Sequence, residues 1–260
     1  MPVTDEVRFE RRDGIGWVTF DRPKARNAMT FAMYERLAEI AGEVNADRAV
    51  RAVVLTGAGG AFVAGTDISQ FADFTEERHA VAYEEKMDRI LGALEDVRVP
   101  TIAAIGGAVT GGGLAIAAAC DLRIASPGAT FGMPIGRTLG NCLSMANLVR
   151  LASLIGVARV KELIFTARLL DAQEALRIGL VSEVTSDDAS LLTRAAELAR
   201  QVASHAPLTL WATKEGLRRI RRRLLPEEGR DLVVLCYTSA DFREGVAAFM
   251  ERRKPTWRGE

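Results

Sequence analysis

The sequence has 260 residues, of which 48% are hydrophobic and 26% are charged, as is ordinary for a folded globular protein. Its 34 basic and 34 acidic residues cancel, so the overall charge favours neither a nucleic acid nor a membrane surface as a partner. Three cysteines without a C-x-x-C pair argue against a disulfide framework and indicate a reducing, cytoplasmic compartment: Cys120, Cys142 and Cys236.

Strands and helices alternate along the first two thirds of the chain. A helix is expected over residues 31–44, where Thr30 can cap the first turn, and another over residues 77–97, just before Pro100. A short buried helix is expected over residues 112–120. Strands are expected at residues 16–20, 50–56, 101–105, 122–125 and 130–131. This alternation predicts α/β architecture.

Helices dominate the chain from Asn141 onward. They are expected over residues 144–154, 157–166, 172–178, 189–204, 208–225 and 228–253. Because Pro207 opens an all-helical end of the chain, we divide the sequence into a core at residues 1–205 and a helical region at residues 206–260.

Several function classes lack their sequence signature. Neither nucleotide motif, G-x-G-x-x-G or G-x-x-x-x-G-K, occurs, there is no G-x-S-x-G elbow, and no His/Cys cluster indicates a metal. His79 and His205 adjoin no recognisable catalytic motif. Residues 99–120 carry no charge, yet Pro100 and five glycines interrupt them. Such a stretch cannot close its own backbone hydrogen bonds in lipid, which argues against a membrane span.

The strongest basic run is Arg218-Arg-Ile-Arg-Arg-Arg223. These residues span nearly two helical turns and so surround much of a helix rather than forming one basic face. Three interpretations remain open: a solvated helix face, contacts with phosphate on a small ligand, or an RNA site. The first is favoured, because a nucleic-acid site needs its charge gathered on one side.

Two glycine-rich loops share the order strand, glycine loop, helix start. Residues 53–68 read VVLTGAGGAFVAGTDI, and residues 100–121 read PTIAAIGGAVTGGGLAIAAACD. Glycines let the backbone approach a ligand closely, and a helix start offers unpaired N–H groups. Brought together, two such loops can aim two backbone N–H groups at one ligand oxygen.

These loops belong to a set of ordered motifs that carry a resemblance. The motifs are RPKARNA at 22–28, LTGAG at 55–59, AFVAGTDI at 61–68, the whole of 100–121, FGMP at 131–134, GLV at 179–181 and FMERRKP at 249–255. Over nearly its whole length the chain resembles the enoyl-CoA hydratase/isomerase family, also called the crotonase superfamily. Any one motif is weak evidence, whereas all of them in order are specific.

The resemblance implies an oxyanion hole for the thioester of an acyl-CoA, with the backbone N–H groups of Thr66 and Gly112 as its donors. An enolate places negative charge on the thioester oxygen, and two fixed donors stabilise it more than they stabilise the ground state. Gly112 also opens a helix, whose dipole adds positive potential there. The family more often has alanine at the position of Thr66, whose β-branched side chain would narrow the acyl pocket. An alternative role for Gly111–Gly113 is tight packing between strand and helix.

The chain departs from the family at both positions where its hydratases carry the glutamates that hold and split water. These positions are Ala115 and Ile135 here, and neither side chain can exchange a proton. The resemblance therefore implies acyl-CoA binding and enolate stabilisation without the usual acid–base groups. Gly136 and Arg137, the next residues along, restore no carboxylate.

Other residues are candidates to replace the missing acids. Arg137 could polarise or pair with an acyl substituent, while Asn141 and Ser144 could orient water or a polar acyl group. Acidic residues after the first loop could also fold over the pocket: Asp73, Glu76 and Glu77. Each has a plain structural alternative, namely an ion pair for Arg137, helix caps for Asn141 and Ser144, and solvated charges for the acids.

The same resemblance implies a coenzyme A site. Lys24 and Arg26 lie in the loop that approaches the phosphates and adenine in relatives, and Lys254 matches a lysine that contacts the nucleotide in some of them. Cationic side chains suit phosphate oxygens, although ordinary surface charge is the alternative. The first loop adds backbone and side-chain contacts, for which the expected residues are Ala64, Asp67 and Ile68. Asp67 is expected to act as a cap rather than as a base. No cofactor is expected beyond the coenzyme A of the substrate.

The fold that the resemblance implies is a spiral of ββα units followed by a helical C-terminal region used for contacts in a homotrimer or a dimer of trimers. Three functions remain open. The first is an acyl-CoA enzyme that uses enolate stabilisation, and the second is a catalytically silent acyl-CoA-binding or regulatory homologue. The third is an RNA-binding or assembly role through the basic helix.

Overall fold

The structure is a computed structural model that describes residues 5–224 and 229–260. A six-stranded sheet has the order β1-β2-β3-β4-β6-β9, in which β1 and β2 are antiparallel and every later pair is parallel. Its strands are β1 (Val7–Arg12), β2 (Ile15–Phe20), β3 (Ala52–Gly57), β4 (Thr101–Ile105), β6 (Leu122–Ala125) and β9 (Glu183–Val184). The α/β class predicted from the sequence is confirmed.

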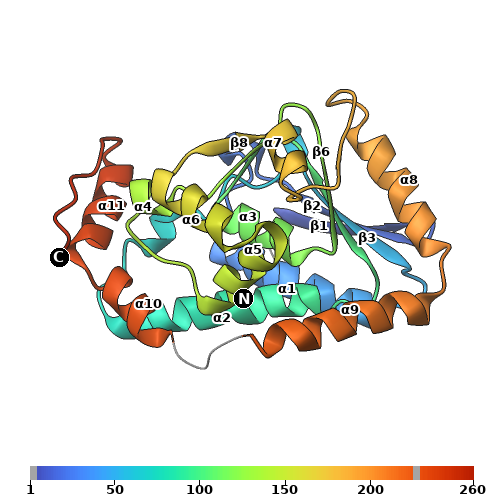
Figure 1. The fold of residues 1–260 in the computed structure, drawn as a ribbon, viewed down its shortest axis with the longest axis horizontal. Coiled ribbons are helices and arrows are strands. Elements are labelled where there is room, and N and C mark those ends of the chain that lie inside the picture. The colour runs from blue at the N-terminus through green and yellow to red at the C-terminus, as the bar shows by residue number, and fades with distance from the viewer. Residues whose placement is uncertain (1–4, 225–228) are drawn as a thin grey trace.

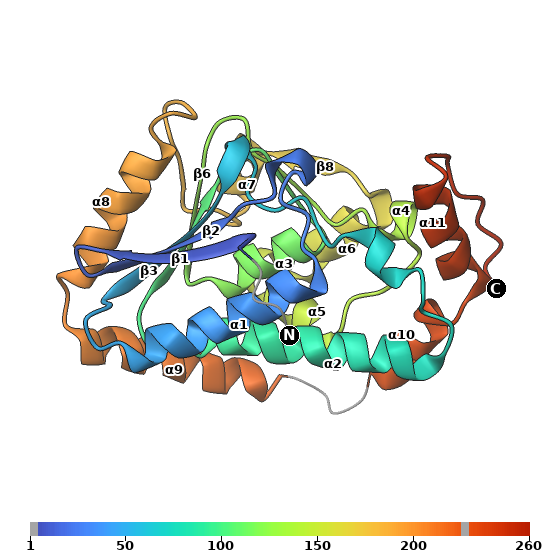
Figure 2. The same ribbon diagram turned by 180° about the vertical axis from the view of Figure 1, so that it is seen from behind.

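Helices cover both faces of this sheet (Figures 1 and 2). On one face, apolar residues of α8 (Leu191–Ala203), such as Ala195, pack on strand residues such as Val54 and Ile102. The larger core lies on the other face, beneath α1 (Phe31–Ala46), α2 (Glu77–Glu95), α3 (Gly112–Ala119) and α5 (Met145–Ile155). As expected, the side chain of Thr30 caps α1 by accepting a hydrogen bond from the N–H of Met33.

A second, three-stranded sheet lies beside the first and carries part of the site. Its order is β5-β7-β8, with β5 (Ala108–Thr110), β7 (Thr130–Gly132) and β8 (Leu169–Asp171). The remaining short elements are η1 (Pro23–Ala25), η2 (Ala58–Gly60), η3 (Ile68–Phe71), α4 (Ile135–Thr138), α6 (Val157–Thr166) and α7 (Ala172–Arg177). The sequence prediction missed the short strands β5, β8 and β9, and it also missed β1, in which four of the six residues are charged and only Val7 and Phe9 are apolar.

The uncharged stretch at residues 99–120 folds into β4, β5 and α3. Among the residues that the structure describes, no helix is long and apolar enough to cross a membrane. Seven of the eight residues of α3 are buried, so its apolar composition reflects a place in the core.

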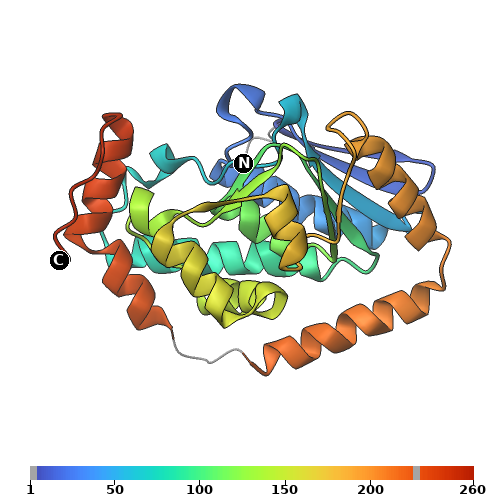
Figure 3. The ribbon, with the colours of Figure 1, turned by 45° about the horizontal axis from the view of Figure 1, so that its top comes forward.

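The C-terminal helices run along one side of the molecule and close one end of it (Figure 3). They are α9 (Pro207–Arg222), α10 (Arg230–Tyr237) and α11 (Ala240–Met250). The prediction of one helix over 228–253 was wrong, because the side chain of Ser239 accepts a hydrogen bond from the N–H of Phe242 and starts a new helix there. The expected ends at Leu225 and Glu228 lie outside the described residues.

The basic run of α9 is paired within the chain. Arg218 and Arg222 contact Asp96, and Arg221 contacts Glu95, at the C-terminal end of α2. Arg219 pairs with Glu215 on its own helix. These carboxylates neutralise much of the run, so the run serves to hold α9 on α2. The RNA-binding interpretation therefore loses its basis.

Asn27 ties the loop after β2 to the loop after β3. Its side chain is fully buried, accepts from the N–H of Arg22 and donates to the carbonyls of Ala58 and Ala61. Its φ of 58° is one that Asn tolerates better than Ala.

We predict that Asn27→Ala lowers the free energy of unfolding by about 2–4 kcal/mol, because it removes one buried and two part-buried hydrogen bonds and strains the backbone. The exposed Lys24→Ala in the same loop should cost less than about 0.5 kcal/mol. Urea denaturation at one protein concentration measures both values, and similar losses for the two variants would contradict the role assigned to Asn27.

Candidate active site

The two glycine-rich loops lie side by side and are joined by backbone hydrogen bonds. The N–H of Phe62 donates to the carbonyl of Gly106 at 2.7 Å, and Val63 forms a parallel bridge with Val109. The hydroxyl of Thr110 donates to the carbonyl of Ala64 at 2.6 Å. The first loop is thereby held against the strand that leads into α3.

This arrangement brings Thr66 and Gly112 close to each other. Met29 donates its N–H to the carbonyl of Gly65, and Asp67 donates to the carbonyl of Met29. A parallel bridge of this form leaves the N–H of Thr66 directed away from Met29. Gly112 is the first residue of α3, whose opening N–H groups have no partner within the helix. A ligand oxygen between them could accept from both.

Gly112 and Gly113 allow this close approach. A Cβ atom on Gly112 would lie 2.0 Å from the hydroxyl oxygen of Tyr34 and 2.8 Å from Oγ1 of Thr66. A Cβ atom on Gly113 would lie 1.9 Å from the carbonyl oxygen of Val63. Since real Cβ atoms do not approach that closely, the first helical turn packs on the first loop only with glycine at these positions. The tight packing expected of these glycines is therefore present.

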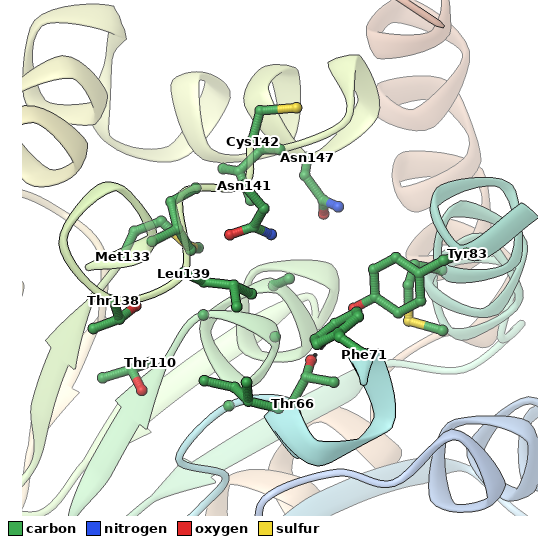
Figure 4. Close-up of a pocket in the computed structure, with 18 of the residues that line it drawn as sticks. Thr66, Phe71, Tyr83, Thr110, Met133, Thr138, Leu139, Asn141, Cys142 and Asn147 are labelled. Carbon is green, nitrogen blue, oxygen red and sulfur yellow. Dashed lines mark hydrogen bonds between the residues drawn. The ribbon is translucent and has the colours of Figure 1, made fainter. Parts of the chain in front are cut away.

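A cavity of about 120 Å³ opens beside these N–H groups. Ala115 and Ile135 both line it, so the two positions singled out in the sequence present apolar side chains to the cavity. Figure 4 shows Thr66 on one wall and Asn141 on the opposite wall, with Phe71 and Tyr83 at the side.

The side chain of Thr66 is fixed by two tyrosines. Its Oγ1 lies 2.9 Å from the hydroxyl of Tyr34 and 3.4 Å from that of Tyr83. Burial raises the pKa of Tyr34 to about 12, so its hydroxyl stays protonated. These contacts hold the hydroxyl of Thr66, a residue that lines the cavity.

Glu84 is the one carboxylate among the described residues that line the cavity. It stands on α2 in line with the apolar residues Ala80, Met87 and Leu91, and its exposed fraction is 8%. The sequence prediction missed it, although a glutamate on the apolar face of a helix was the available signal. Of the acids proposed instead, Asp73, Glu76 and Glu77 are exposed, and Glu77 pairs with Arg230.

The carboxylate of Glu84 accepts hydrogen bonds from two other parts of the chain. The hydroxyl of Tyr237, at the end of α10, donates to Oε1 of Glu84. The backbone N–H of Ser144 also donates to it. Asn141 donates through Nδ2 to the hydroxyl of Tyr237 at 3.0 Å. A chain of hydrogen bonds thus runs from Asn141 through Tyr237 to the carboxylate.

Burial raises the pKa of Glu84 to about 7, and the nearby carboxylate of Asp88 adds to the rise, while the bond from Tyr237 opposes it. Asp88 accepts a hydrogen bond of 2.7 Å from the hydroxyl of Ser144, and its own pKa is raised by burial. A carboxyl group of this kind is close to half-ionised at neutral pH, as a group that exchanges protons with a ligand needs to be.

Of the residues considered as substitutes, the structure brings Asn141 and Ser144 to the neighbourhood of Glu84. Asn141 lines the cavity, and its Oδ1 is buried without a hydrogen-bond partner among the described residues. Such an acceptor calls for a donor on a bound molecule. Ser144 caps α5 by accepting from the N–H of Asn147. Arg137 is exposed on α4 and is not among the residues that line the cavity.

The residues proposed to hold coenzyme A lie in two places. Lys24 and Arg26 are exposed, and the carbonyl of Arg26 accepts from the N–H of Ala64, which lines the cavity. Ile68 lines the cavity as well. Lys254 lies in the exposed segment that follows α11.

Asp67 stabilises the loop in which it lies. Its side chain caps η3 and pairs with Arg22 at 2.7 Å. Although burial acts to raise its pKa, hydrogen bonds from Ser69 and Arg22 leave the pKa below its ordinary value. Asp67 is therefore held as a carboxylate and is poorly suited to act as a base.

The sequence matches a family model described as Enoyl-CoA hydratase/isomerase over residues 10–260. It is 38% identical to the short-chain-enoyl-CoA hydratase of Clostridium acetobutylicum, with 96% of each chain covered. A crystal structure of a monofunctional enoyl CoA isomerase from M. smegmatis is 34% identical, has a TM-score of 0.71, and covers 84% of this chain and 95% of that one. The structure of methylmalonyl-CoA decarboxylase in complex with 2-nitronate-propionyl-CoA is 26% identical in sequence and has a TM-score of 0.88. This match covers 98% of this chain and 99% of that chain.

Because the pKa of Glu84 is raised, the stability of the protein is predicted to depend on pH. Below its ordinary value of 4.5 the group is protonated in both states, and as the pH rises from there to about 7 only the unfolded state ionises. The free energy of unfolding of the wild-type protein therefore falls by about 3 kcal/mol over this window, relative to that of Glu84→Gln, in which the position cannot titrate.

Urea denaturation of both proteins at a series of pH values measures that difference. Glu85→Gln, at an exposed neighbour on α2, is the matched control and should follow the wild-type curve. A difference between wild type and Glu84→Gln that stays constant from pH 4.5 to 7 would contradict the environment described for Glu84.

Proposed function

Because the chain belongs to the enoyl-CoA hydratase/isomerase family, we propose that it binds an acyl-CoA and stabilises the thioester enolate with the N–H groups of Thr66 and Gly112. The observation that carries this proposal is the close approach of these two residues at the edge of a cavity, with the Cβ position of Gly112 only 2.8 Å from Oγ1 of Thr66. Each such donor is typically worth about 3 kcal/mol of barrier.

The proposed chemistry is proton transfer at carbon rather than efficient addition of water. Hydration in the family requires two glutamates to hold and split water, and Ala115 and Ile135 occupy those positions on the cavity wall. Enolate formation needs only the oxyanion hole and one group that accepts a proton. Exchange at the carbon beside the thioester, or isomerisation of a double bond through the same enolate, fits this site.

The acyl group is proposed to be short. A cavity of about 120 Å³ is smaller than the roughly 150 Å³ cavity that takes up benzene. It suits an acyl group of about four or five carbons on that scale. Side chains such as Met87, Leu139 and Phe71 supply its apolar lining. The relative named a short-chain-enoyl-CoA hydratase is consistent with this size.

The coenzyme A portion is proposed to lie across the loop that carries Lys24 and Arg26, with Lys254 as a further cation for its phosphates. The support is that this loop adjoins Ala64 at the cavity. Because coenzyme A is part of the substrate, no other cofactor is proposed.

A homotrimer or dimer of trimers is the proposed assembly. Large apolar side chains are exposed on the C-terminal helices, and burial between subunits would account for them. They include Leu208, Trp211, Leu217, Ile220, Leu235, Phe249 and Met250.

A silent acyl-CoA-binding or regulatory protein is the second candidate function. It is favoured by the apolar side chains at Ala115 and Ile135, which leave the usual catalytic positions without chemistry. Such a protein would bind acyl-CoA as proposed and would not turn it over.

Incubation with butyryl-CoA and with crotonyl-CoA in heavy water separates the two candidates. We predict that mass spectrometry finds deuterium at the carbon next to the thioester of butyryl-CoA, and little addition of water to crotonyl-CoA. Unchanged masses for ligands that bind, as measured by calorimetry, would contradict the enzyme and support the silent acyl-CoA binder.

The oxyanion hole is tested by two substitutions made in a background of Tyr34→Phe with Thr66→Ala, which removes both hydroxyls that a Cβ on Gly112 would meet and keeps the N–H of residue 66. Gly112→Ala and Gly112→Pro both add a Cβ atom, but only proline lacks the N–H, and the first helical position tolerates proline. We predict that deuterium exchange is at least about 100-fold slower with proline than with alanine. Equal rates in two folded variants would contradict the assignment of Gly112.

The coenzyme A site is tested by the double variant Lys24→Ala with Arg26→Ala. We predict a higher KM for an acyl-CoA and an unchanged KM for the matching acyl-pantetheine, which lacks the nucleotide and its phosphates. A rise in KM for both substrates would contradict contacts with the phosphates.

A further inference from the structure

We propose that Glu84, presented by α2 from outside both glycine loops, is the acid–base group that takes a proton from the bound acyl chain and returns it. This inference rests on the enolate function proposed above and supplies the group that Ala115 and Ile135 cannot provide. It follows from where the carboxylate lies, what holds it and what surrounds it.

Glu84 shares one small cavity with both proposed N–H donors. Thr66, Gly112 and Glu84 all line a space of about 120 Å³. An acyl group of four or five carbons held at the N–H groups would fill that space, so its carbons would come into contact with the carboxylate. No other carboxylate lines the cavity in the part of the chain that the structure describes.

Two donors from distant parts of the sequence fix the carboxylate. Tyr237 reaches it from α10, and the N–H of Ser144 reaches it from the start of α5. The bond from Asn141 orients the hydroxyl of Tyr237 in turn. A buried glutamate without a function would be costly to retain, since an apolar residue at this place would complete the face formed by Met87 and Leu91.

The charges around Glu84 suit a group that gives and takes a proton. Asp88 faces it from its own helix, Tyr34 from α1, Tyr83 from α2, Tyr237 from α10, and Cys142 from the loop before α5. Among the residues that the structure describes, no cation is one of the groups that shift its pKa, and burial brings that pKa to about 7. Both protonation states are therefore populated near neutral pH.

The proposed step balances without another reactant. Glu84 takes the proton on the carbon next to the thioester, and the electron pair of that C–H bond becomes the carbon–carbon double bond of the enolate. The carbonyl electron pair moves to the thioester oxygen, where Thr66 and Gly112 donate hydrogen bonds. The protonated Glu84 then returns a proton to the same carbon, or to the far end of a conjugated enolate, which moves the double bond.

The test uses the full-length protein, butyryl-CoA and heavy water. We expect Glu84→Gln to bind butyryl-CoA within a few-fold of wild type by calorimetry and to lose deuterium exchange at least about 100-fold. Glu85→Gln, which changes an exposed glutamate next to it on α2, should exchange at the wild-type rate. Exchange by wild type that survives in Glu84→Gln overturns the role of Glu84 and leaves the enolate function standing. If the wild-type protein shows no deuterium exchange, both the role of Glu84 and the proposed enolate function are overturned.

Tyr237→Phe gives a second test that does not depend on the folding of Glu84→Gln. In wild type the exchange rate should rise with pH to a plateau, with a midpoint near the pKa of about 7. Removing the hydroxyl that stabilises the carboxylate should move this midpoint to higher pH by about one unit. A midpoint that does not move, or a wild-type rate that does not depend on pH between 5 and 9 (about two units either side), overturns the proposal.

Discussion

The close contact between the first turn of α3 and the loop after β3 is the constraint on which the rest of the site depends. Gly112 and Gly113 have no room for a side chain, because Tyr34 and Val63 already occupy it. The contact exists because β3 and β4 are parallel neighbours, so the segments that follow them leave the sheet at the same end. The sheet thereby fixes the placement of two N–H groups.

This arrangement separates two tasks. In the proposed chemistry the main chain stabilises charge on oxygen, so the side chain of Thr66 is not itself the donor. In the same proposal proton transfer depends on side chains, and those of Ala115 and Ile135 on the cavity wall are apolar. The polar group of the cavity comes instead from α2, supported by Tyr237 of α10. The helical end of the chain is thus part of the site as well as a candidate surface for assembly.

Local patterns allowed much of the fold and only part of the site to be predicted. The strand at 101–105, the helix at 157–166 and the cap at Thr30 follow from neighbouring residues and match the structure. The short strands β5 and β9 exist only because a distant partner pairs with them. Glu84 escaped prediction for the same reason, since its environment comes from residues about 60 and 153 positions away in the sequence. A glutamate on an apolar helix face was the only local sign of it.

The most direct measurement of the central claim is a crystal structure of the protein with butyryl-CoA. The account predicts the thioester oxygen within hydrogen-bond distance of the N–H groups of both Thr66 and Gly112, with the neighbouring carbon facing the carboxylate of Glu84. A thioester oxygen bound elsewhere, or an acyl chain outside the cavity lined by Ala115 and Ile135, would contradict it.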